Sequence, residues 1–407
     1  MYIERHLETV VEKMGEMFGA VLVIGSRQVG KTTLLRHVKP ELSYVTLDDP
    51  IALASAVEEP GTFFKNIRLP VVLDEIQYAP GVFPHIKMAV DEEGKKGLFF
   101  LSGSQQLRMM ESVSESLVGR VGILKLMGLS LREMGASNFD LPFVPDENYF
   151  AKRERALVQV GYNEIWSAVH RGSMPAMHAD EGMDWQWFYA AYTKTYIERD
   201  VRDLAQVGDE VRFMKFMTAV AARTGQMLNL SAVAREVGVT QPTADRWLSV
   251  LAASNLVYLL QPYHNNVTKR AVKTPKLYFL DTGLAAYLTR WNTPETLQNG
   301  AMAGAFFESF VVAEIVKSYT NAGILEPPMY YYRDKEQREI DILIERDGTL
   351  YPLEIKKYAD PKPEDVRAFD VLDKIPGVKR GPGGLICLYD RLLPLKGADR
   401  IVPVWYI

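Results

Sequence analysis

The sequence has a single cysteine in 407 residues, and this scarcity excludes several kinds of site. With Cys387 alone, neither an internal disulfide nor a cysteine-rich zinc site can form. The six histidines are scattered, without pairs at metal-ligand spacing. The opening stretch MYIERHLETVVEK lacks an apolar core of signal-peptide length, and no apolar run approaches the roughly 20 residues that span a bilayer. We therefore expect a cytoplasmic protein that does not contact a membrane.

A strong charge of one sign is also missing. The net charge is −4 at pH 7, and the hydrophobic and charged fractions of 47% and 24% are those of an ordinary globular protein. Any contact with nucleic acid must therefore use a local basic patch. The length predicts two or three domains. We expect these domains at residues 1–140, 150–290 and 295–407.

The stretch AVLVIGSRQVGKTTLLRHV, residues 20–38, places a phosphate-binding motif between an expected strand and an expected helix. Its core, GSRQVGKT, matches G-x-x-x-x-G-K-T in the required setting. The glycines let backbone N–H groups approach phosphate oxygens, and the helix N-terminus adds partial positive charge. We expect Lys31 to reach the β- and γ-phosphates of a nucleotide and Thr32 to offer a hydroxyl to Mg²⁺. The predicted nucleotide-binding residues are Gly25, Ser26, Arg27, Gln28, Val29, Gly30, Lys31, Thr32 and Thr33.

A second motif, LPVVLDEIQ at residues 69–77, predicts a buried parallel strand that ends in two carboxylates. Ligands of open α/β sheets bind at the carboxyl ends of the strands. We expect Asp74 to hold Mg²⁺, directly or through water, and Glu75 to orient or deprotonate the attacking water. The alternative is a pair of solvated acids at a strand end.

Three further strands are expected, at residues 43–49, 97–106 and 120–130. Five strands separated by helical segments predict a parallel, doubly wound sheet. Ser102 and Ser104 end the fourth strand, where a hydroxyl could sense the γ-phosphate. Arg120 could supply positive charge to the transition state, from its own chain or from a neighbour in a dimer or ring. An exposed arginine is more often simply solvated.

Taken in their order along the chain, the motifs resemble those of a large family of bacterial and archaeal AAA-type ATPases that carry a C-terminal domain of unknown function. The resemblance rests on residues 25–32, Asp74-Glu75, FLSGSQQ, LVGRV and LMGLSLREM, and then on HRGSMPAM and YTKTYIERDVRDL. It implies a hydrolase with ATP and Mg²⁺ as cofactors. One departure is Gly128, where the family pattern has proline. Glu198, Arg199 and Asp200 alternate in sign, which is typical of surface or inter-domain ion pairs.

Residues 135–150, GASNFDLPFVPDENYF, are rich in turn-forming types and predict a linker. Beyond it, residues 228–266 favour a winged helix-turn-helix, with Ser231 and Thr240 as helix caps and a turn at Gly238. The apolar residues expected on one face of the second helix are Ala244, Trp247, Leu248 and Leu251.

The expected wing carries four cations, which are Lys269, Arg270, Lys273 and Lys276. Binding to DNA requires such cations near phosphates, and polar side chains near base edges. The wing favours DNA contact, whereas Asp245 on the outer face of the second helix opposes it. Both DNA contact and a structural packing role remain open.

Near the other end, REIDILIERDGTLYPLEIKK at residues 338–357 predicts a hairpin around Asp347-Gly348. A two-residue turn pairs Arg346 with Thr349 and places Asp341 opposite Glu354. It also places Glu339 opposite Lys356. All four charged residues then lie on one face, and the set Ile340, Ile342, Leu353 and Ile355 lies on the other.

Opposed like charges destabilise a sheet, so a bound cation would relieve the cost of Asp341 against Glu354. Mg²⁺ takes carboxylate oxygens, and Glu308 in an expected helix at 305–319 could turn toward it. Lys356 would then help to generate hydroxide or neutralise a phosphodiester under attack. A helix is expected at 363–375 and a strand at 383–390, and this order of elements resembles the core of the PD-(D/E)XK nucleases.

That resemblance implies a restriction-endonuclease-like α/β domain with a second Mg²⁺ site. A solvated face with an exposed Glu339–Lys356 ion pair is the alternative, and so is a nuclease-like fold without activity. The leading hypothesis is an ATP-hydrolysing protein whose nucleotide state controls a C-terminal half acting on a partner, DNA included. An ATP-gated metal-dependent nuclease and a non-catalytic switch that binds DNA or an unknown protein are the alternatives.

Overall fold

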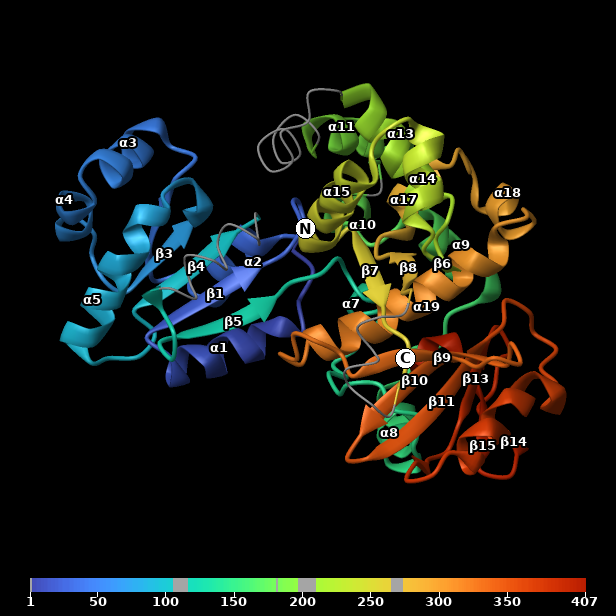
Figure 1. The fold of residues 1–407 in the computed structure, drawn as a ribbon. Helices are drawn as coiled ribbons and strands as arrows, with labels where there is room; N and C mark the ends of the chain where they lie inside the picture. Colours follow the sequence, from blue (N-terminus) through green and yellow to red (C-terminus); the bar gives the residue numbers. More distant parts are fainter. Residues whose placement is uncertain (1, 105–115, 181, 197–209, 265–273) are drawn as a thin grey trace.

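The computed structural model describes residues 2–104, 116–180, 182–196, 210–264 and 274–407. In Figure 1 an N-terminal α/β part, in blue and cyan, lies beside a helical part in green and yellow. A C-terminal sheet, in orange and red, lies below the helical part. Among the described helices, none combines the length and apolar character that crossing a bilayer requires.

The N-terminal sheet is parallel and has the order β2-β3-β4-β1-β5. Its strands are β1 Ala20–Ile24, β2 Ser43–Thr46, β3 Val71–Asp74, β4 Phe99–Gly103 and β5 Val121–Lys125. Every residue of β1, β3 and β4 is buried, which matches their unbroken apolar sequences. The five expected strands and the parallel α/β fold of this part are confirmed.

Helices cover both faces of this sheet. Leu7, Val11 and Leu34 of α1 Leu7–Met17 and α2 Lys31–Val38 share one apolar cluster with Val21 of β1. The opposite cluster joins the other face to α3 Pro50–Glu58, α4 Pro60–Lys65 and α5 Phe83–Glu93. Two short 3₁₀ helices, η1 Ile76–Tyr78 and η2 Pro80–Val82, follow β3. The sheet is therefore covered by helices on both sides, as expected.

The segment predicted as a linker, residues 135–150, is instead packed into the molecule. It follows α7 Leu131–Met134 and leads into α8 Glu147–Arg153 and η3 Glu154–Ala156. Phe143 is fully buried, and its backbone N–H and C=O bond Ser318 and Tyr319 at 3.0 Å each. The Gly, Pro and Asn content correctly indicated irregular backbone, but the aromatic side chains bury the segment.

The middle part is mostly helical. Its helices are α9 Tyr162–Arg171, α10 Pro175–Ala179, α11 Trp185–Tyr196, α13 Glu210–Ala221, α14 Leu230–Val237, α15 Gln241–Ala253, α17 Thr282–Leu288 and α18 Pro294–Gln298. A small antiparallel sheet of order β6-β8-β7 is built from Gln226–Met227, Lys276–Phe279 and Val257–Leu260. Helix α13, strand β6, helices α14 and α15 and strands β7 and β8 follow one another along the chain.

The helix–turn–helix expected here is formed by α14 and α15. Thr240 caps α15, and all four residues expected on its apolar face are buried. Ser231 does not cap α14, because Asn229 is the N-cap and accepts from the Ala232 N–H at 3.0 Å. Three of the expected wing cations and the alternating charges lie outside the described residues, and these are Lys269, Arg270, Lys273, Glu198, Arg199 and Asp200.

The C-terminal sheet has the order β14-β15-β13-β11-β10-β9, with β12 beside β11. Its strands are β9 Met329–Arg333, β10 Glu339–Arg346, β11 Thr349–Ile355, β12 Lys379–Arg380, β13 Gly384–Cys387, β14 Leu393–Lys396 and β15 Asp399–Pro403, followed by η6 Val404–Tyr406. Helix α19 Ala303–Thr320 joins the large core on one face of the sheet. The segment expected as a helix at 363–375 is a 3₁₀ helix, η5 Pro363–Lys374, and its apolar residues join a separate smaller cluster.

The hairpin register is as expected, because Arg346 pairs with Thr349 and Ile342 with Leu353. The prediction that side chains alternate strictly between the two faces along β10 is wrong. A bulge against β9 lies between Ile340 and Leu343, so Ile340 joins the small cluster while Ile342 joins the large core. The sequence pattern did not indicate this extra residue.

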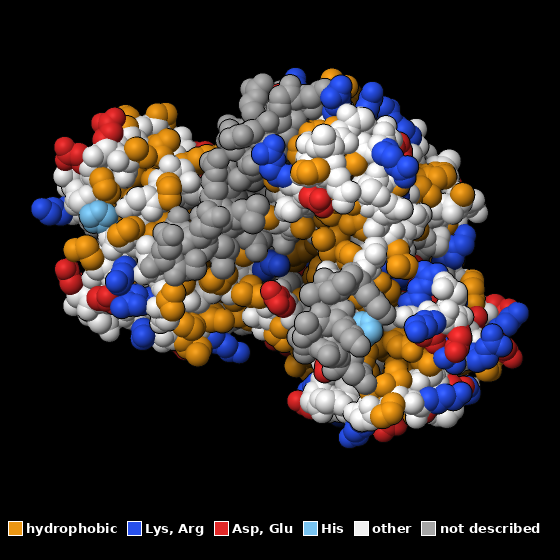
Figure 2. Space-filling model, viewed as in Figure 1, with side chains coloured by type: hydrophobic (Ala, Val, Ile, Leu, Met, Phe, Trp, Pro, Cys, Tyr) orange, Lys and Arg blue, Asp and Glu red, His pale blue; other side chains and the backbone are white. Residues whose placement is uncertain are grey.

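Charges of both signs are mixed on the surface. On the face drawn in Figure 2, Lys and Arg side chains lie among Asp and Glu over the C-terminal part, without a broad area of one sign among the coloured residues. This agrees with the small net charge of the sequence.

Candidate functional site

The loop between β1 and α2 has the conformation that its glycines permit. Gln28 and Gly30 have left-handed φ values of 62° and 92°, and α2 begins at Lys31. A Cβ atom on Gly25 would lie 2.2 Å from the Leu126 carbonyl oxygen, so no side chain fits there. The loop therefore packs against the chain segment after β5 and presents its backbone to the carboxyl edge of the sheet.

Lys31 lies inside this loop. It is 6% exposed, and its ammonium donates to the carbonyls of Gly25 at 3.1 Å and Ser26 at 2.9 Å. The N-terminus of α2 adds partial positive charge at the same place. The loop thus concentrates donors where phosphate oxygens would bind.

Asp74 is the centre of a hydroxyl cluster at the end of β3. It is 5% exposed and accepts from Thr32 Oγ1 at 2.9 and 3.0 Å, from the Tyr44 hydroxyl at 2.8 Å and from Ser102 Oγ. The structure therefore brings together Thr32 and Asp74, which were predicted to hold Mg²⁺, and Ser102, which was predicted to sense the γ-phosphate. Tyr44 was missed, because its approach depends on the β2–β3 pairing. Burial and then the bond to Asp74 raise the pKa of Tyr44 to about 12.

Glu75 follows directly and has a left-handed φ of 55°, which is uncommon for a residue other than glycine. Its Oε2 accepts from Gln77 Nε2, and the same amide lies 3.4 Å from Ser104 Oγ. Gln77 is 5% exposed, so the contact is held in the protein interior. Gln77 was not predicted as a site residue, although it lies only two positions after Glu75.

Arg120 lies at the opposite edge of the sheet. It precedes β5, whose first residue pairs with Ala20 at the start of β1, about 16 Å of strand away from the phosphate loop. Its guanidinium bonds Asp91 at 2.6 and 3.0 Å. In this arrangement Arg120 does not reach the phosphate loop of its own chain. Action on a neighbouring chain stays a prediction.

Arg5, which the sequence did not indicate, supports the phosphate loop from the N-terminal segment. It is 5% exposed and donates to the carbonyls of Val29 at 2.9 Å and Met127 at 2.7 Å. It also pairs with Glu133 at 3.0 Å. Burial alone would raise the pKa of Glu133, but the charges of Arg5 and His6 and hydrogen bonds from Ser130 and Arg5 lower it to about 2.

A cavity of 340 Å³ adjoins the loop on the side of the helical part. Its lining is largely apolar and comprises Tyr2, Ile3, Arg5, Val29, Gly30, Thr33, Leu129, Pro175, Ala176 and Ala179. Of the predicted nucleotide residues, Val29, Gly30 and Thr33 reach this cavity. Gly128 lies close by in sequence, and a Cβ there would lie 2.3 Å from Ser173 Oγ, which accounts for glycine in place of the proline of the family pattern.

The predicted C-terminal carboxylates do gather, but around a lysine of the middle sheet. Lys276, the first residue of β8, is 4% exposed. Its ammonium lies 3.2 Å from Glu308 Oε1, 2.5 Å from Glu339 Oε1 and 3.6 Å from Asp341 Oδ1. The expectation that Lys276 is a wing cation available to DNA is therefore wrong. We call Lys276, Glu308, Glu339, Asp341, Glu354 and Lys356 the ionic cluster.

Hydrogen bonds fix the remaining members. The Tyr278 hydroxyl donates to Glu308 Oε1 at 2.6 Å, and the Ile355 N–H donates to Asp341 Oδ2 at 2.9 Å. Lys356 bonds Glu354 Oε1 at 2.6 Å. The exposed Glu339–Lys356 ion pair of the alternative hypothesis is not formed. Instead, Glu339 pairs with Lys276 and Lys356 pairs with Glu354.

Burial and then the charge of Asp341 raise the pKa of Glu308 to about 7 and that of Glu354 to about 8. Burial lowers the pKa of Lys276, but the charges of Glu308, Asp341 and Glu339 together raise it. The surrounding acids thus favour the charged form of Lys276, whereas burial and the charge of Asp341 favour the neutral forms of Glu308 and Glu354. Within the described ranges, no group of three or more His, Cys, Asp or Glu side chains is arranged to hold a metal ion.

Helix α19 contacts both the ionic cluster and α7, the short helix that lies next to the phosphate loop in the network of Arg5. Glu308 near its start belongs to the ionic cluster, and Glu314, one turn and a half later, is 3% exposed and accepts from the Leu131 N–H at 2.7 Å. Lys317 bonds Glu314 at 2.8 Å and the Leu129 carbonyl at 2.9 Å. Because Leu131 and Glu133 belong to α7, this contact continues to the Arg5–Val29 bond at the phosphate loop.

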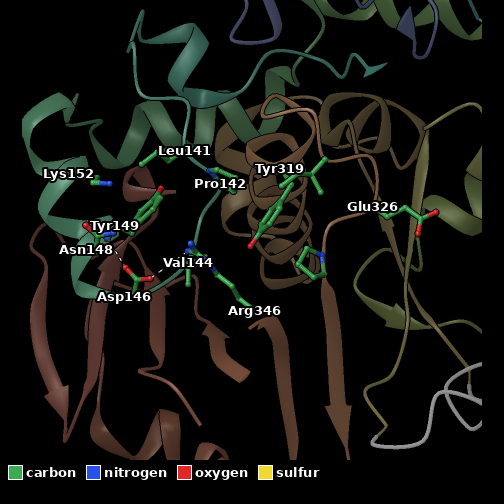
Figure 3. A pocket seen from close by; sticks show the side chains of 12 residues that line it. Leu141, Pro142, Val144, Asp146, Asn148, Tyr149, Lys152, Tyr319, Glu326 and Arg346 are labelled. Atoms are coloured by element: carbon green, nitrogen blue, oxygen red, sulfur yellow. Dashed lines mark hydrogen bonds and ion pairs between the residues drawn. The ribbon is translucent and has the colours of Figure 1, made fainter. Parts of the chain in front are cut away.

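A further cavity of 490 Å³ opens between residues 141–152, the end of α19 and the start of the hairpin turn (Figure 3). Tyr149 and Tyr319 line it, and Arg346 lies 3.9 Å from Asp146 at its rim. Its lining is mainly apolar with charges of both signs, and no member of the ionic cluster or the phosphate loop is among the residues that define it.

Comparison with known proteins gives family matches along most of the chain. An AAA domain matches residues 18–135. Domains of unknown function match residues 162–295 (DUF8612) and 303–407 (DUF4143).

Among solved structures, the Walker-type ATPase PABY2304 of Pyrococcus abyssi is 15% identical with a TM-score of 0.44, covering 70% of this chain and 96% of that one. AMPPCP-bound DnaA of Aquifex aeolicus is 14% identical with a TM-score of 0.30, covering 60% and 85%. At these identities and TM-scores the two similarities carry no conclusion.

Two curated relatives are the uncharacterized proteins Mb2031c of Mycobacterium bovis and Rv2008c of Mycobacterium tuberculosis. Each is 30% identical over 344 residues, which cover 84% of this chain and 71% of the relative. The AAA match coincides with the parallel sheet, the phosphate loop and the Asp74 cluster described above. The chain therefore belongs to the family of these mycobacterial proteins and carries an AAA-type P-loop ATPase domain at its N-terminus.

Proposed function

We propose that the protein binds ATP with Mg²⁺ and hydrolyses it, and that its nucleotide state sets the arrangement of the C-terminal half on a partner. One observation supports the proposal that the protein binds and hydrolyses ATP. Lys31 in the phosphate loop, Thr32 on Asp74, and Glu75 held by Gln77 all lie at one edge of the parallel sheet.

The donor set fits the triphosphate and its metal ion. The backbone of residues 25–32 and the Lys31 ammonium would bind the phosphates, and the oxygens of Thr32 and Asp74 are the ligand types that Mg²⁺ prefers. The metal ion would supply charge neutralisation on the phosphate oxygens. Ser102 positions the Asp74 carboxylate, and Gln77 positions Glu75, which would orient the attacking water.

The apolar cavity beside Gly30 suits the base of the nucleotide. Ile3 and Leu129 offer apolar surface, and Pro175 belongs to α10 of the helical part. A base in this cavity would contact the N-terminal segment, the ATPase domain and the helical part together. Nucleotide binding would thereby bias how the two parts sit against each other.

The contact from Arg5 through α7 to α19 supports control of the C-terminal half by the nucleotide. Arg5 bonds the loop at Val29, and α19 bonds α7 through Glu314. The order of elements from α13 to β8 supports a winged helix, in which the buried Lys276 takes no part in DNA contact. DNA contact through the other three expected wing cations stays a prediction.

The nuclease alternative has less support in this arrangement. Its proposed metal position among Glu308, Asp341 and Glu354 adjoins the ammonium of Lys276, which pairs with the first two. This arrangement therefore supports a C-terminal half that responds to nucleotide better than it supports an active metal-dependent nuclease.

The test of the hydrolysis proposal is Glu75→Gln. The amide keeps the size of the side chain but cannot take a proton, so ATP turnover should fall at least about 100-fold. Binding of ATP, measured by equilibrium dialysis, should be retained. Glu93→Gln, an exposed acid paired with Lys95, is the matched control and should hydrolyse ATP normally. Wild-type turnover by Glu75→Gln would refute the role of Glu75.

A further inference from the structure

The cavity of Figure 3 is enclosed by parts of the chain that are distant in sequence. Residues 141–152 form one wall, the end of α19 and the segment 324–328 form another, and Arg346 of β10 lies at the rim. Its volume of 490 Å³ lies within the range of about 300–1,000 Å³ that small-molecule sites occupy in proteins. The residues that line it belong neither to the phosphate loop nor to the ionic cluster.

Two tyrosine rings form fixed walls of this cavity. Tyr149 and Tyr319 are each 4% exposed. The Tyr149 hydroxyl donates to the Tyr406 carbonyl at 2.7 Å and accepts from Arg132 at 2.6 Å. The Tyr319 hydroxyl donates to the Phe143 carbonyl at 3.0 Å. Neither ring can turn to fill the space without breaking a buried hydrogen bond, so the fold keeps the cavity open.

Most of the remaining wall is apolar. It includes the side chains of Leu141, Pro142, Val144, Ile324 and Pro328. Protein interiors are usually packed without voids much larger than a water molecule, so the walls of this cavity lack contacts that an apolar ligand would provide. The lining therefore favours a ligand with an apolar body.

Two cations at the rim have no acid within hydrogen-bonding distance among the described residues. The Arg346 guanidinium lies 3.9 Å from Asp146 and 3.7 Å from Asp347, and its side chain is 57% exposed. Lys152 is exposed, and no acid in the described part of the chain pairs with it. Both cations are therefore available to a ligand that carries negative charge.

The two acids of the lining are engaged elsewhere. Asp146 caps α8 by accepting from the Tyr149 N–H at 2.7 Å. The Glu326 carboxylate points away from Tyr319 in Figure 3. Burial lowers the pKa of Lys125, and the charge of Glu326 partly offsets this effect, so Glu326 acts on a cation outside the cavity. The charge that remains available at the rim is therefore positive.

We propose that this cavity binds a small organic anion, with its apolar body against Tyr149 and Tyr319 and its anionic group toward Arg346 and Lys152. The apolar body would gain the contacts that the walls lack, and the rim cations would select for the charge. The site goes beyond the proposed ATPase function, because it shares no residue with the candidate nucleotide site.

The test is isothermal titration calorimetry of the full chain with decanoate near neutral pH, below the concentration at which decanoate forms micelles. We expect one saturable site per chain, half-saturated below about 1 mM. Butanoate keeps the charge but loses most of the apolar body, and decanol keeps the body but loses the charge. Each should bind at least about tenfold more weakly than decanoate.

Two variants locate the site. Ile324→Trp enlarges a lining side chain that is 39% exposed, so it should fill the cavity without disturbing the core and weaken decanoate binding at least about tenfold. Lys152→Gln combined with Arg346→Gln should weaken decanoate binding about tenfold and leave decanol binding unchanged. Lys13→Gln combined with Arg391→Gln removes two exposed cations that do not line the cavity and is the matched control, which should bind as the wild type does.

Folded wild-type protein that takes up no decanoate at a saturable site would overturn the proposal. So would equal affinity for decanol and decanoate, or wild-type affinity in the variant without the two rim cations. That variant changes only exposed side chains, so it keeps the test decisive even if Ile324→Trp does not fold.

Discussion

At the scale of single residues, the candidate nucleotide site is organised by one carboxylate. Asp74 accepts from the hydroxyls of Thr32, Tyr44 and Ser102, which come from α2, β2 and β4. Each hydroxyl satisfies part of a buried charge and restricts where its oxygens point. In the proposed site, the orientation of the Asp74 carboxylate would therefore depend partly on these hydroxyls, including that of Tyr44, which is not among the proposed ligands of phosphate or metal.

Ser102→Ala tests this dependence. Hydrogen bonds to charged groups are worth about 1.5–3 kcal/mol, so we expect ATP turnover to fall about tenfold or more. The concentration of Mg²⁺ that half-saturates turnover should rise, because Asp74 is held less firmly. Steady-state assays across Mg²⁺ concentrations measure both. Ser55→Ala on α3, which does not bond Asp74, should leave both values unchanged, and an unaltered Mg²⁺ dependence in Ser102→Ala would contradict the role.

The buried carboxylate of Glu133 should make the stability of the fold depend on pH. Its folded pKa of about 2 lies below the ordinary value of 4.5, so its ionised form stabilises the fold above pH 4.5. This stability, roughly 3 kcal/mol, is lost as the pH falls from 4.5 toward 2. Urea unfolding should show Glu133→Gln less stable than the wild type at pH 7, with the difference shrinking at pH 3. A difference that stays constant with pH would contradict the Arg5–Glu133 pairing.

Sequence reasoning predicted the residues of the phosphate loop, Asp74 and Ser102 because their motifs follow strands whose carboxyl ends meet at one edge. It missed Tyr44 and Arg5, whose positions depend on strand pairing and on the path of the N-terminal segment. It placed Lys276 in an exposed wing because nothing in a run of basic residues indicates which one is buried against acids of another domain.

At the scale of elements, α19 is the helix that reaches both candidate regions. Residues on all sides of it are buried, so it lies between the helical part and the C-terminal sheet, as Figure 1 shows. About 9 Å along its axis separates Glu308 from Glu314. Helix α19 bonds α7 through Glu314 and belongs to the ionic cluster through Glu308, so in the proposed coupling it would carry a displacement from the ATPase domain to the C-terminal half.

Glu314→Gln tests that link. The substitution removes the charge that pairs with buried Lys317, which should destabilise the fold by about 3–5 kcal/mol. Chemical unfolding should show this loss of stability. In hydrogen exchange, the protection of residues 303–320 should no longer change when ATP is added. Nucleotide binding should persist. Glu336→Gln, at an exposed pair with Arg338, is the control. A wild-type exchange response in Glu314→Gln would contradict the link.

The elements themselves were largely predictable. Apolar runs gave the five parallel strands, and Asp347-Gly348 gave the hairpin with its correct register. The bulge in β10 and the 3₁₀ form of η5 were not predictable, because both result from packing against neighbouring elements. The supposed linker at 135–150 shows the same effect, since Phe143 and its neighbours are drawn into the core.

At the scale of the whole molecule, the candidate nucleotide site adjoins the junction between the ATPase domain and the helical part. The cavity beside the phosphate loop has walls from the N-terminal segment and from α10. The ionic cluster lies at a second junction, between the small middle sheet and the C-terminal sheet. Under the proposed function, these two junctions are where we expect nucleotide or a partner to change the arrangement of the parts. The sequence predicted the order of the parts but not the contacts between them.

The central claim is that the N-terminal loop and Asp74 hold a nucleotide, and equilibrium dialysis with labelled ATP and Mg²⁺ tests it most directly. The account predicts one saturable site per wild-type chain, no saturable uptake by Lys31→Ala, and wild-type uptake by Lys13→Ala, an exposed lysine on α1. Absence of uptake by folded wild-type protein, or equal uptake by Lys31→Ala, would contradict it.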